Sequence, residues 1–347
     1  MRPFYDLAVN LPLRSVVASR LTHRLHRHAV DTDTLGYPYP AGHPRVLAAI
    51  AGWMDRHGSP GAVDRLTLTL GARHALSLAL DMTCAKGDVL LMEALTYHGF
   101  RGVAEARGVR IAPVAMDEQG LLPAALAQAA RTTGARTVYV QPTLHNPTTV
   151  TMPTTRRHEI AEVATQLGLT IIEGDVYGPL ATDRLPSLAS LVPERCFHAG
   201  GIGKVLGPGL RVGWLMAPNP ERHAQVVRTV TDATDGLPAL WPAIVADWLT
   251  DGTADELLET LRTALRERNA LARSILGEAL VTADGLHAWL PCADAEGWAT
   301  RAAQAGIKTT LGRRIGDDQP QGLRLSLATE EDPERLTTAL RTLAALR

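Results

Sequence analysis

The stretch Ala199-Gly200-Gly201-Ile202-Gly203-Lys204-Val205-Leu206-Gly207-Pro208-Gly209-Leu210-Arg211-Val212-Gly213-Trp214 surrounds one lysine with closely spaced glycines and places an arginine seven residues after it. Glycine has no Cβ, so the backbone can adopt positive φ angles here and approach a ligand closely. This pattern favours Lys204 as a reactive amine. A surface loop whose lysine points into water is the alternative, and only the rest of the chain can decide between them.

Length and composition indicate a soluble globular protein. The chain has 347 residues, 46% hydrophobic and 20% charged, and 35 basic against 36 acidic residues give a formal net charge of −1. This length predicts one large domain with a smaller terminal domain. The even charge balance argues against a nucleic-acid partner, and no apolar run approaches the roughly 18 residues that span a membrane.

The cysteines and the N-terminus predict the compartment. Cys84, Cys196 and Cys292 are isolated, without a CxxC pair, which argues against a disulfide framework and a metal site. The first six residues lack an apolar signal core. We therefore expect a cytoplasmic protein that holds no metal.

Strands and helices alternate through the first two thirds of the chain. Hydrophobic periodicity predicts strands at 64–70, 89–92, 109–114, 137–141, 169–173, 196–199 and 212–216, with helices at 72–83, 97–106, 122–130 and 153–166. Strands separated by helices predict an α/β fold, with a doubly wound, mainly parallel sheet. Ligands bind beyond the carboxyl ends of the strands in such sheets.

The remaining segments complete a predicted division into an N-terminal arm (1–36), a large domain (37–250) and a smaller α+β C-terminal domain (251–347). The arm contains a candidate helix at 15–28. Long amphipathic helices are expected at 221–251 and 254–277. The tail then alternates, with strands expected at 285–290, 308–311 and 323–328 and helices at 295–305 and 333–345.

Several predicted strands end in polar groups that suit a ligand. Gly71-Ala72-Arg73 joins a strand to a helix, whose free N–H groups and dipole can bind a phosphate. Tyr97 offers a ring for stacking, Asn146 offers an amide donor, and residues 173–177 bring acids and a phenol together. Each motif alone is equally explained by an ordinary turn or a packing side chain.

Taken together, the order of these motifs is more specific. Asn146 precedes Tyr177 by 31 residues, and Lys204 follows Tyr177 by 27. Further short motifs extend this series over nearly the whole chain: 36–42 (GYPYPAG), 70–76 (LGARHAL), 87–89 (GDV), 142–149 (PTLHNPTT), 285–290 (GLHAWL) and 322–326 (GLRLS). The sequence resembles fold-type I pyridoxal-phosphate enzymes of the aminotransferase class I/II family, and within it the aminotransferase-like domain of MocR/GabR-type regulators.

The resemblance implies a pyridoxal 5'-phosphate cofactor bound as a Schiff base to Lys204, which would also move the substrate's α-proton. Tyr177 and Asn146 would hydrogen-bond the cofactor's phenolic oxygen, and Tyr97 would stack on its ring. The residues implied to hold the phosphate are Gly71, Ala72, Arg73, Arg211 and, from a second subunit, Tyr37.

The resemblance also implies the partners. Arg324 would bind the α-carboxylate of an amino-acid substrate, with Asn146 and Asn10 beside it. A 2-oxo acid would be the second substrate if the reaction is amino transfer. Because Tyr37 would reach the other subunit's cofactor, we expect a homodimer with shared active sites.

Four positions depart from the family pattern. Gly174 stands where the family has the acid that pairs with the pyridine nitrogen. We expect Asp175 to replace it as a catalytic and cofactor-binding residue, with Glu173 as second choice. Gly201 and Gly203 replace serines of the phosphate site, and His98 stands where a proline is common.

The sequence predicts a pyridoxal-phosphate enzyme acting on an α-amino acid, by default an aminotransferase. The altered acid and the glycines favour a second possibility, elimination, replacement or cyclisation in specialised metabolism. A ligand-sensing regulator is disfavoured because residues 1–36 are too short for a DNA-binding domain. A catalytically dead relative is disfavoured because Lys204, Tyr177, Asn146 and Arg324 are all present.

Overall fold

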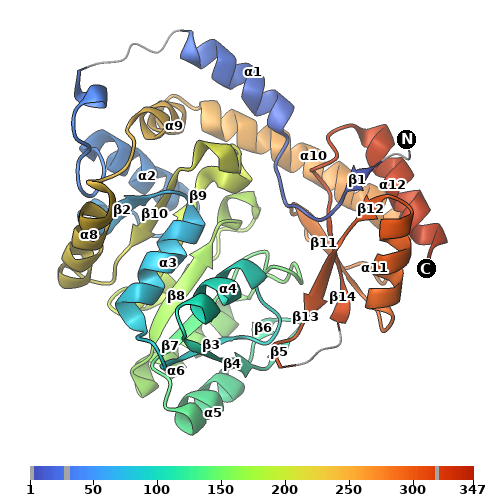
Figure 1. Ribbon diagram of the computed structural model, residues 1–347, viewed down its shortest axis with the longest axis horizontal. Coiled ribbons are helices and arrows are strands. Elements are labelled where there is room, and N and C mark those ends of the chain that lie inside the picture. The colour runs from blue at the N-terminus through green and yellow to red at the C-terminus, as the bar shows by residue number, and fades with distance from the viewer. Residues whose placement is uncertain (1–3, 27–31, 317–319) are drawn as a thin grey trace.

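A computed structural model describes residues 4–26, 32–316 and 320–347, and a seven-stranded sheet lies at its centre (Figure 1). The strand order is β2-β10-β9-β8-β7-β3-β4, and only β10 runs against its neighbours among these strands. The strand bounds are β2 Leu66–Thr69, β3 Val89–Glu93, β4 Arg110–Val114, β7 Thr137–Val140, β8 Thr170–Asp175, β9 Cys196–Gly201 and β10 Gly213–Met216. The predicted mainly parallel α/β fold is confirmed.

The helices between these strands pack against the sheet. Helix α3 (Ala72–Thr83) begins directly after Gly71, whose φ of 77° suits a residue without a Cβ, and it lies across β8, β9 and β10. Its apolar face, including Ala75 and Leu80, is fully buried. The other elements of this part are α2 Pro44–Arg56, α4 His98–Ala106, β5 Met116–Asp117, β6 Gly120–Leu121, α5 Pro123–Thr133, α6 Thr154–Leu167 and α7 Leu188–Leu191.

The predicted single helix at 221–251 is wrong. The chain forms α8 (Pro220–Thr234) and α9 (Leu240–Thr250), which are separated by a turn. Asp235 and Gly236 both have positive φ angles, of 52° and 104°, and Pro238 follows without an N–H to donate. These residues end the first helix although the apolar periodicity continues across them.

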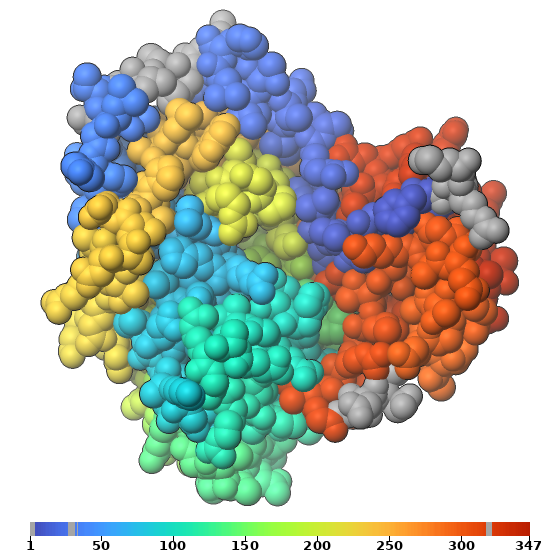
Figure 2. All heavy atoms as spheres, viewed as in Figure 1, coloured from blue at the N-terminus to red at the C-terminus, as the bar shows by residue number. Residues whose placement is uncertain are grey.

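The C-terminal part is built on an antiparallel sheet with the order β11-β14-β13. The N-terminal segment joins this part, because β1 (Tyr5–Asp6) pairs with β12 (Ile307–Lys308). In Figure 2 this segment, in blue, descends between the large sheet's part and the C-terminal part. The remaining bounds are α1 Arg14–Leu25, β11 His287–Pro291, α11 Ala295–Gln304, β13 Thr310–Arg313, β14 Pro320–Ser326 and α12 Pro333–Ala345.

Two apolar cores underlie this arrangement. The larger lies around the seven-stranded sheet, and the smaller includes Leu7 of the N-terminal segment. Helix α10 (Thr253–Leu276) contributes Leu261 to the larger core and Ala272 to the smaller one. The domain boundaries at residues 36 and 250 stay a prediction. In the described part of the chain, no helix is long and apolar enough to cross a membrane.

Candidate active site

A cavity of about 700 Å³ lies at the carboxyl ends of β7, β8 and β9, where the sheet faces the N-terminal segment and β13 and β14. This is the place where ligands bind in parallel α/β sheets. Its walls contain most of the predicted site residues: Asn10, Gly71, Ala72, Arg73, Tyr97, Asn146, Tyr177, Lys204, Arg211 and Arg324.

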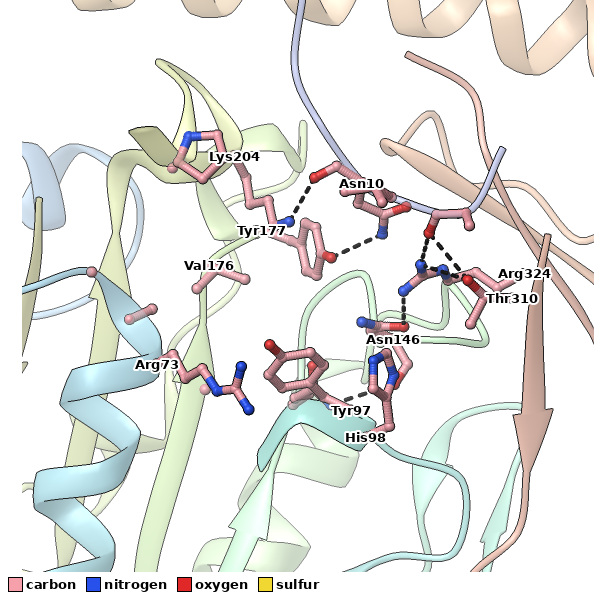
Figure 3. Close-up of a pocket in the computed structure, with 18 of the residues that line it drawn as sticks. Asn10, Arg73, Tyr97, His98, Asn146, Val176, Tyr177, Lys204, Thr310 and Arg324 are labelled. Atoms are coloured by element: carbon pink, nitrogen blue, oxygen red, sulfur yellow. Dashed lines mark hydrogen bonds between the residues drawn. The ribbon is translucent and has the colours of Figure 1, made fainter. Parts of the chain in front are cut away.

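Lys204 ends a short 3₁₀ turn that directly follows β9. Its Nζ donates a 2.7 Å hydrogen bond to the backbone oxygen of Asn10 and lies 5.7 Å from the centroid of the Tyr177 ring (Figure 3). The side chain therefore lines the cavity beside other polar groups, which removes the alternative of a lysine that merely points into water.

Tyr177 is oriented by an amide from the N-terminal segment. Asn10 Nδ2 donates to the Tyr177 hydroxyl at 3.0 Å and lies 3.0 Å from Nδ1 of His287. The other ring nitrogen of His287 faces the His145 carbonyl oxygen at 3.1 Å, which can only accept, so Nδ1 is the acceptor for Asn10. Burial, with the Arg324 charge second, lowers the pKa of His287 to about 3 and keeps it neutral. The Tyr177 hydroxyl accepts the hydrogen bond from Asn10, so its own O–H is left to donate to a ligand.

Arg324 and Asn146 form the wall opposite Lys204 (Figure 3). Arg324 is 4% exposed, and its Nη1 donates to Asn146 Oδ1 at 3.0 Å. Its Nη2 donates to Thr310 Oγ1 and to the Ala8 carbonyl oxygen, while its buried Nε has no partner among the described residues. Since Oδ1 of Asn146 is occupied, its NH₂ group is left to face the cavity.

An anion site lies at the N-terminus of α3. The amides of Ala72 and Arg73 are in the first turn and have no intrahelical partner. The guanidinium of Arg211 contacts Gly71, where a Cβ would stand 3.2 Å from Nη2. A Cβ at Gly201 would stand 3.4 Å from the Ala72 nitrogen, so the glycine leaves that amide open. Backbone amides and one arginine are thus available where the family has serines.

The first residue of α4 and the residue before it supply two aromatic rings to the cavity. Tyr97 and His98 both line it, with their ring centroids 5.5 Å apart. Burial, followed by the charges of Arg324 and Arg73, lowers the pKa of His98, so the imidazole is neutral at pH 7. Arg73 itself donates to the Gly99 carbonyl oxygen at 3.2 Å, which turns its guanidinium toward Tyr97 (Figure 3).

Asp175 and Glu173 do not line the cavity. Asp175 Oδ2 lies 3.3 Å from His198 Nε2, and Ser59 donates to the same oxygen. Glu173 is fully buried and accepts hydrogen bonds from two backbone amides of α7. Side chains alternate along a strand, so Gly174 faces the cavity and both acids face the other side of β8. Their positions do not support the roles that the sequence suggested for them.

Comparison with known proteins decides the family. Residues 3–339 match the sequence model of the aminotransferase class I and II family. The chain belongs to this family. The predicted family and its pyridoxal-phosphate cofactor are thereby confirmed. The specific reaction is a separate matter.

Four relatives illustrate the range of the family. The 2-aminoadipate transaminase of Thermus thermophilus is 29% identical over 90% of this chain and 83% of its own length. The uncharacterized HTH-type transcriptional regulator YdfD of Bacillus subtilis is 28% identical over 85% of this chain. The chain spans 64% of that regulator's length, and 50% and 65% of two further Bacillus regulators.

A solved structure of an aminotransferase agrees with this family assignment. LysN, the α-aminoadipate aminotransferase of Thermus thermophilus in complex with N-(5'-phosphopyridoxyl)-L-leucine, superposes with a TM-score of 0.87. The two share 26% sequence identity over 99% of this chain and 92% of that one.

The cavity of this family member fits pyridoxal phosphate. An amine, two donors for a phenolic oxygen and an anion site line one cavity, and the unpaired Nε of Arg324 leaves a cationic donor for a carboxylate. Tyr37 is 89% exposed and does not line the cavity of its own chain, so its predicted role still rests on a second subunit.

Sequence reasoning missed Tyr139, Gln141 and His287. Tyr139 lines the cavity from β7 beside Gly174. The parallel register could have indicated it, because Tyr139 is aligned with Ile172, whose side chain shares a face with residue 174. His287 had no such signal, since its contact with Asn10 depends on how the C-terminal sheet meets the N-terminal segment.

Proposed function

We propose that this protein transfers the amino group of an α-amino acid to a 2-oxo acid with pyridoxal phosphate. The observation that carries the proposal is the convergence of Lys204, Tyr177, Asn146 and Arg324 on one cavity, although they come from four separate segments. Each is the residue type that amino transfer requires at its position.

Each group has a role in binding. Lys204 would hold the cofactor covalently, Tyr177 and Asn146 would donate to its phenolic oxygen, and Tyr97 would stack on its ring. The first turn of α3 and Arg211 would bind its phosphate. When bound, the cofactor supplies a ring that stabilises negative charge on the substrate Cα.

The remaining steps belong to side chains of this chain. Arg324 would bind the substrate carboxylate through its unpartnered Nε, which fixes the Cα next to Lys204. Lys204 would then remove the proton from that Cα as a neutral amine. The carbonyl oxygen of Asn10, 2.7 Å from Nζ, holds the amine in the cavity between proton transfers.

One observation favours a second reaction class. Of the residues that line the cavity, all within the described part of the chain, none is an aspartate or glutamate. A cofactor whose ring nitrogen lacks a carboxylate partner stabilises a carbanion less, which disfavours amino transfer relative to elimination, replacement or cyclisation.

We also propose a cytoplasmic homodimer with shared active sites. Leu35 and Tyr37 are 82% and 89% exposed in the single chain, which is unusual for large apolar side chains and suits a surface that a second subunit covers. Sedimentation of the purified protein at micromolar concentration tests this proposal, and a monomer would contradict it.

A substrate panel tests the reaction. The purified, cofactor-loaded protein is incubated with single amino acids and 2-oxoglutarate, and glutamate formation is measured. New glutamate supports amino transfer. Ammonia, pyruvate or a rearranged carbon skeleton without glutamate would overturn it in favour of the second class. The 2-aminoadipate named for two of the relatives belongs in the panel.

Replacing Arg324 by glutamine is expected to raise KM and to lower kcat/KM by about 10²-fold, because one charged partner of the carboxylate is lost. Steady-state kinetics with the best amino acid of the panel measures this. The control is the corresponding amine without a carboxylate, whose turnover should change little. Equal losses for both substrates would show that Arg324 supports the fold and not carboxylate binding.

A further inference from the structure

The strands β7 and β8 form the cavity wall at Gly174. The family has an acidic residue at this position, and here a neighbouring side chain fills the space in its place. A Cβ built on Gly174 would stand 2.9 Å from the hydroxyl oxygen of Tyr139 and 3.0 Å from its Cε2. The phenol therefore occupies the space that a side chain at position 174 would need. The glycine and the tyrosine are complementary in shape.

Tyr139 is held firmly. It is 1% exposed, and its ring packs against Phe100 with centroids 4.5 Å apart. Tyr139 lines the cavity, and its hydroxyl lies beside Gly174, another lining residue, without a hydrogen bond within the described residues. A buried hydroxyl without a partner is costly, so this group is suited to a polar atom of a bound ligand.

The chemistry of pyridoxal phosphate indicates which atom that is. Its reactive carbon, its phenolic oxygen and its phosphate arm occupy three adjacent ring carbons, and the ring nitrogen lies on the opposite side. Lys204, the Tyr177 and Asn146 donors and the α3 anion site provide for the first three groups. Along the wall of β7 and β8, the polar side chains left in the described lining are Tyr139 and Gln141.

Gln141 is the weaker candidate of the two. Its Nε2 lies 3.5 Å from both Thr96 Oγ1 and the Asn146 carbonyl oxygen, so its donor hydrogens already have neighbours. The Tyr139 hydroxyl has a free hydrogen, and it fills the space beside Gly174, which has no side chain of its own to compete for that place.

We propose that the Tyr139 hydroxyl donates a hydrogen bond to the ring nitrogen of pyridoxal phosphate, in place of the carboxylate that Gly174 lacks. This inference rests on the proposed cofactor site and adds a new residue to it. Burial, with the Glu93 charge second, raises the pKa of Tyr139 well above its ordinary value. The phenol therefore keeps its proton, and the ring nitrogen remains neutral.

A neutral ring nitrogen has a chemical consequence. An uncharged pyridine withdraws electrons less strongly than a pyridinium, so negative charge on the substrate Cα is stabilised less. Tyr139 would thus bind and orient the ring while it limits the lifetime of the carbanion. This offers one physical reason for the second reaction class, whereas the hydrogen bond itself would be made in either class.

The test is the ¹⁵N NMR resonance of ring-labelled pyridoxal phosphate bound to the full chain. We expect the wild-type resonance in the range of a neutral, hydrogen-bonded pyridine. In Tyr139→Phe it should move further from the pyridinium range, and the cofactor should bind about 3- to 10-fold more weakly. In the double variant Gly174→Asp/Tyr139→Leu, the new carboxylate has room beside the ring nitrogen, and the ¹⁵N resonance should move into the pyridinium range.

Tyr5→Phe is the matched control, because Tyr5 is a buried tyrosine of β1 that does not line the cavity. It should leave the resonance and the cofactor affinity unchanged. A wild-type resonance in the pyridinium range would overturn the inference. So would an unmoved resonance in Tyr139→Phe, in particular if Gln141→Leu moved it instead. A protein that binds no cofactor at all would instead remove the proposed function itself.

Discussion

Replacing Lys204 by alanine is expected to lower the rate of amino transfer by at least about 10⁴-fold, the upper end of what a positioned acid–base group contributes. The variant loses both the amine that would hold the cofactor and the base at the substrate Cα. The visible absorption band of the covalently bound cofactor should disappear as well. Single-turnover kinetics and an absorption spectrum measure the two losses separately.

Two controls separate chemistry from folding. Lys204→Arg keeps the positive charge near the Asn10 carbonyl oxygen. Because a guanidinium stays protonated in proteins, it cannot accept the substrate's proton, and this variant should be as inactive as the alanine variant. A small primary amine added to Lys204→Ala should restore part of the rate, because the truncated side chain leaves room for it. Substantial activity in Lys204→Ala without added amine would refute the assigned role.

Much of the fold could be predicted from the sequence, because strand and helix periods in the βα units are local. Helix α12 (Pro333–Ala345) starts and ends where the pattern predicts. The helix expected at 221–251 could not be predicted, because its apolar period continues across Asp235 and Gly236 while the backbone turns there. The pairing of β1 with β12 is non-local and left no local signal.

The same distinction between local and non-local features applies to the candidate site. Residues that follow strands, such as Lys204 and Tyr177, could be predicted because strand ends meet at one edge of the sheet. For the other site residues, the direction in which a side chain leaves its strand determines whether the residue lines the cavity. Asp175 is only one residue from Gly174, yet it faces the opposite side of β8. Tyr139 could be found only through the contact between neighbouring strands.

Because Asp175 faces away from the cavity, its removal should affect stability and not the cofactor. Asp175→Ala leaves the imidazole of His198, 1% exposed, without its carboxylate partner. Loss of one member of a buried ion pair costs about 3–5 kcal/mol in the free energy of unfolding. Urea unfolding at pH 6 measures this. Glu105→Ala, at the exposed pair with Arg101, should cost no more than about 0.5 kcal/mol.

The pH dependence of the free energy of unfolding follows from both members of the pair, Asp175 and His198. Burial is the largest single influence and opposes both charged groups, but their mutual hydrogen bond, nearby opposite charges and backbone hydrogen bonds together outweigh it, so the pKa of Asp175 is lowered and the pKa of His198 is raised. The Asp175 contribution is present above its unfolded pKa of about 3.9 and is lost as the pH falls through its folded pKa. The His198 contribution is present below its unfolded pKa of about 6.5 and is lost as the pH rises through its folded pKa.

The difference in stability between wild type and Asp175→Ala should therefore be largest between about pH 4 and pH 6.5 and should shrink toward pH 9. Adding His198→Phe to Asp175→Ala should recover part of the loss, because no buried charge is then left unpaired. The opposite result is equally informative. If Asp175→Ala kept the wild-type stability but shifted the absorption band of the bound cofactor, Asp175 would reach the ring nitrogen, and the assignment of that role to Tyr139 would fail.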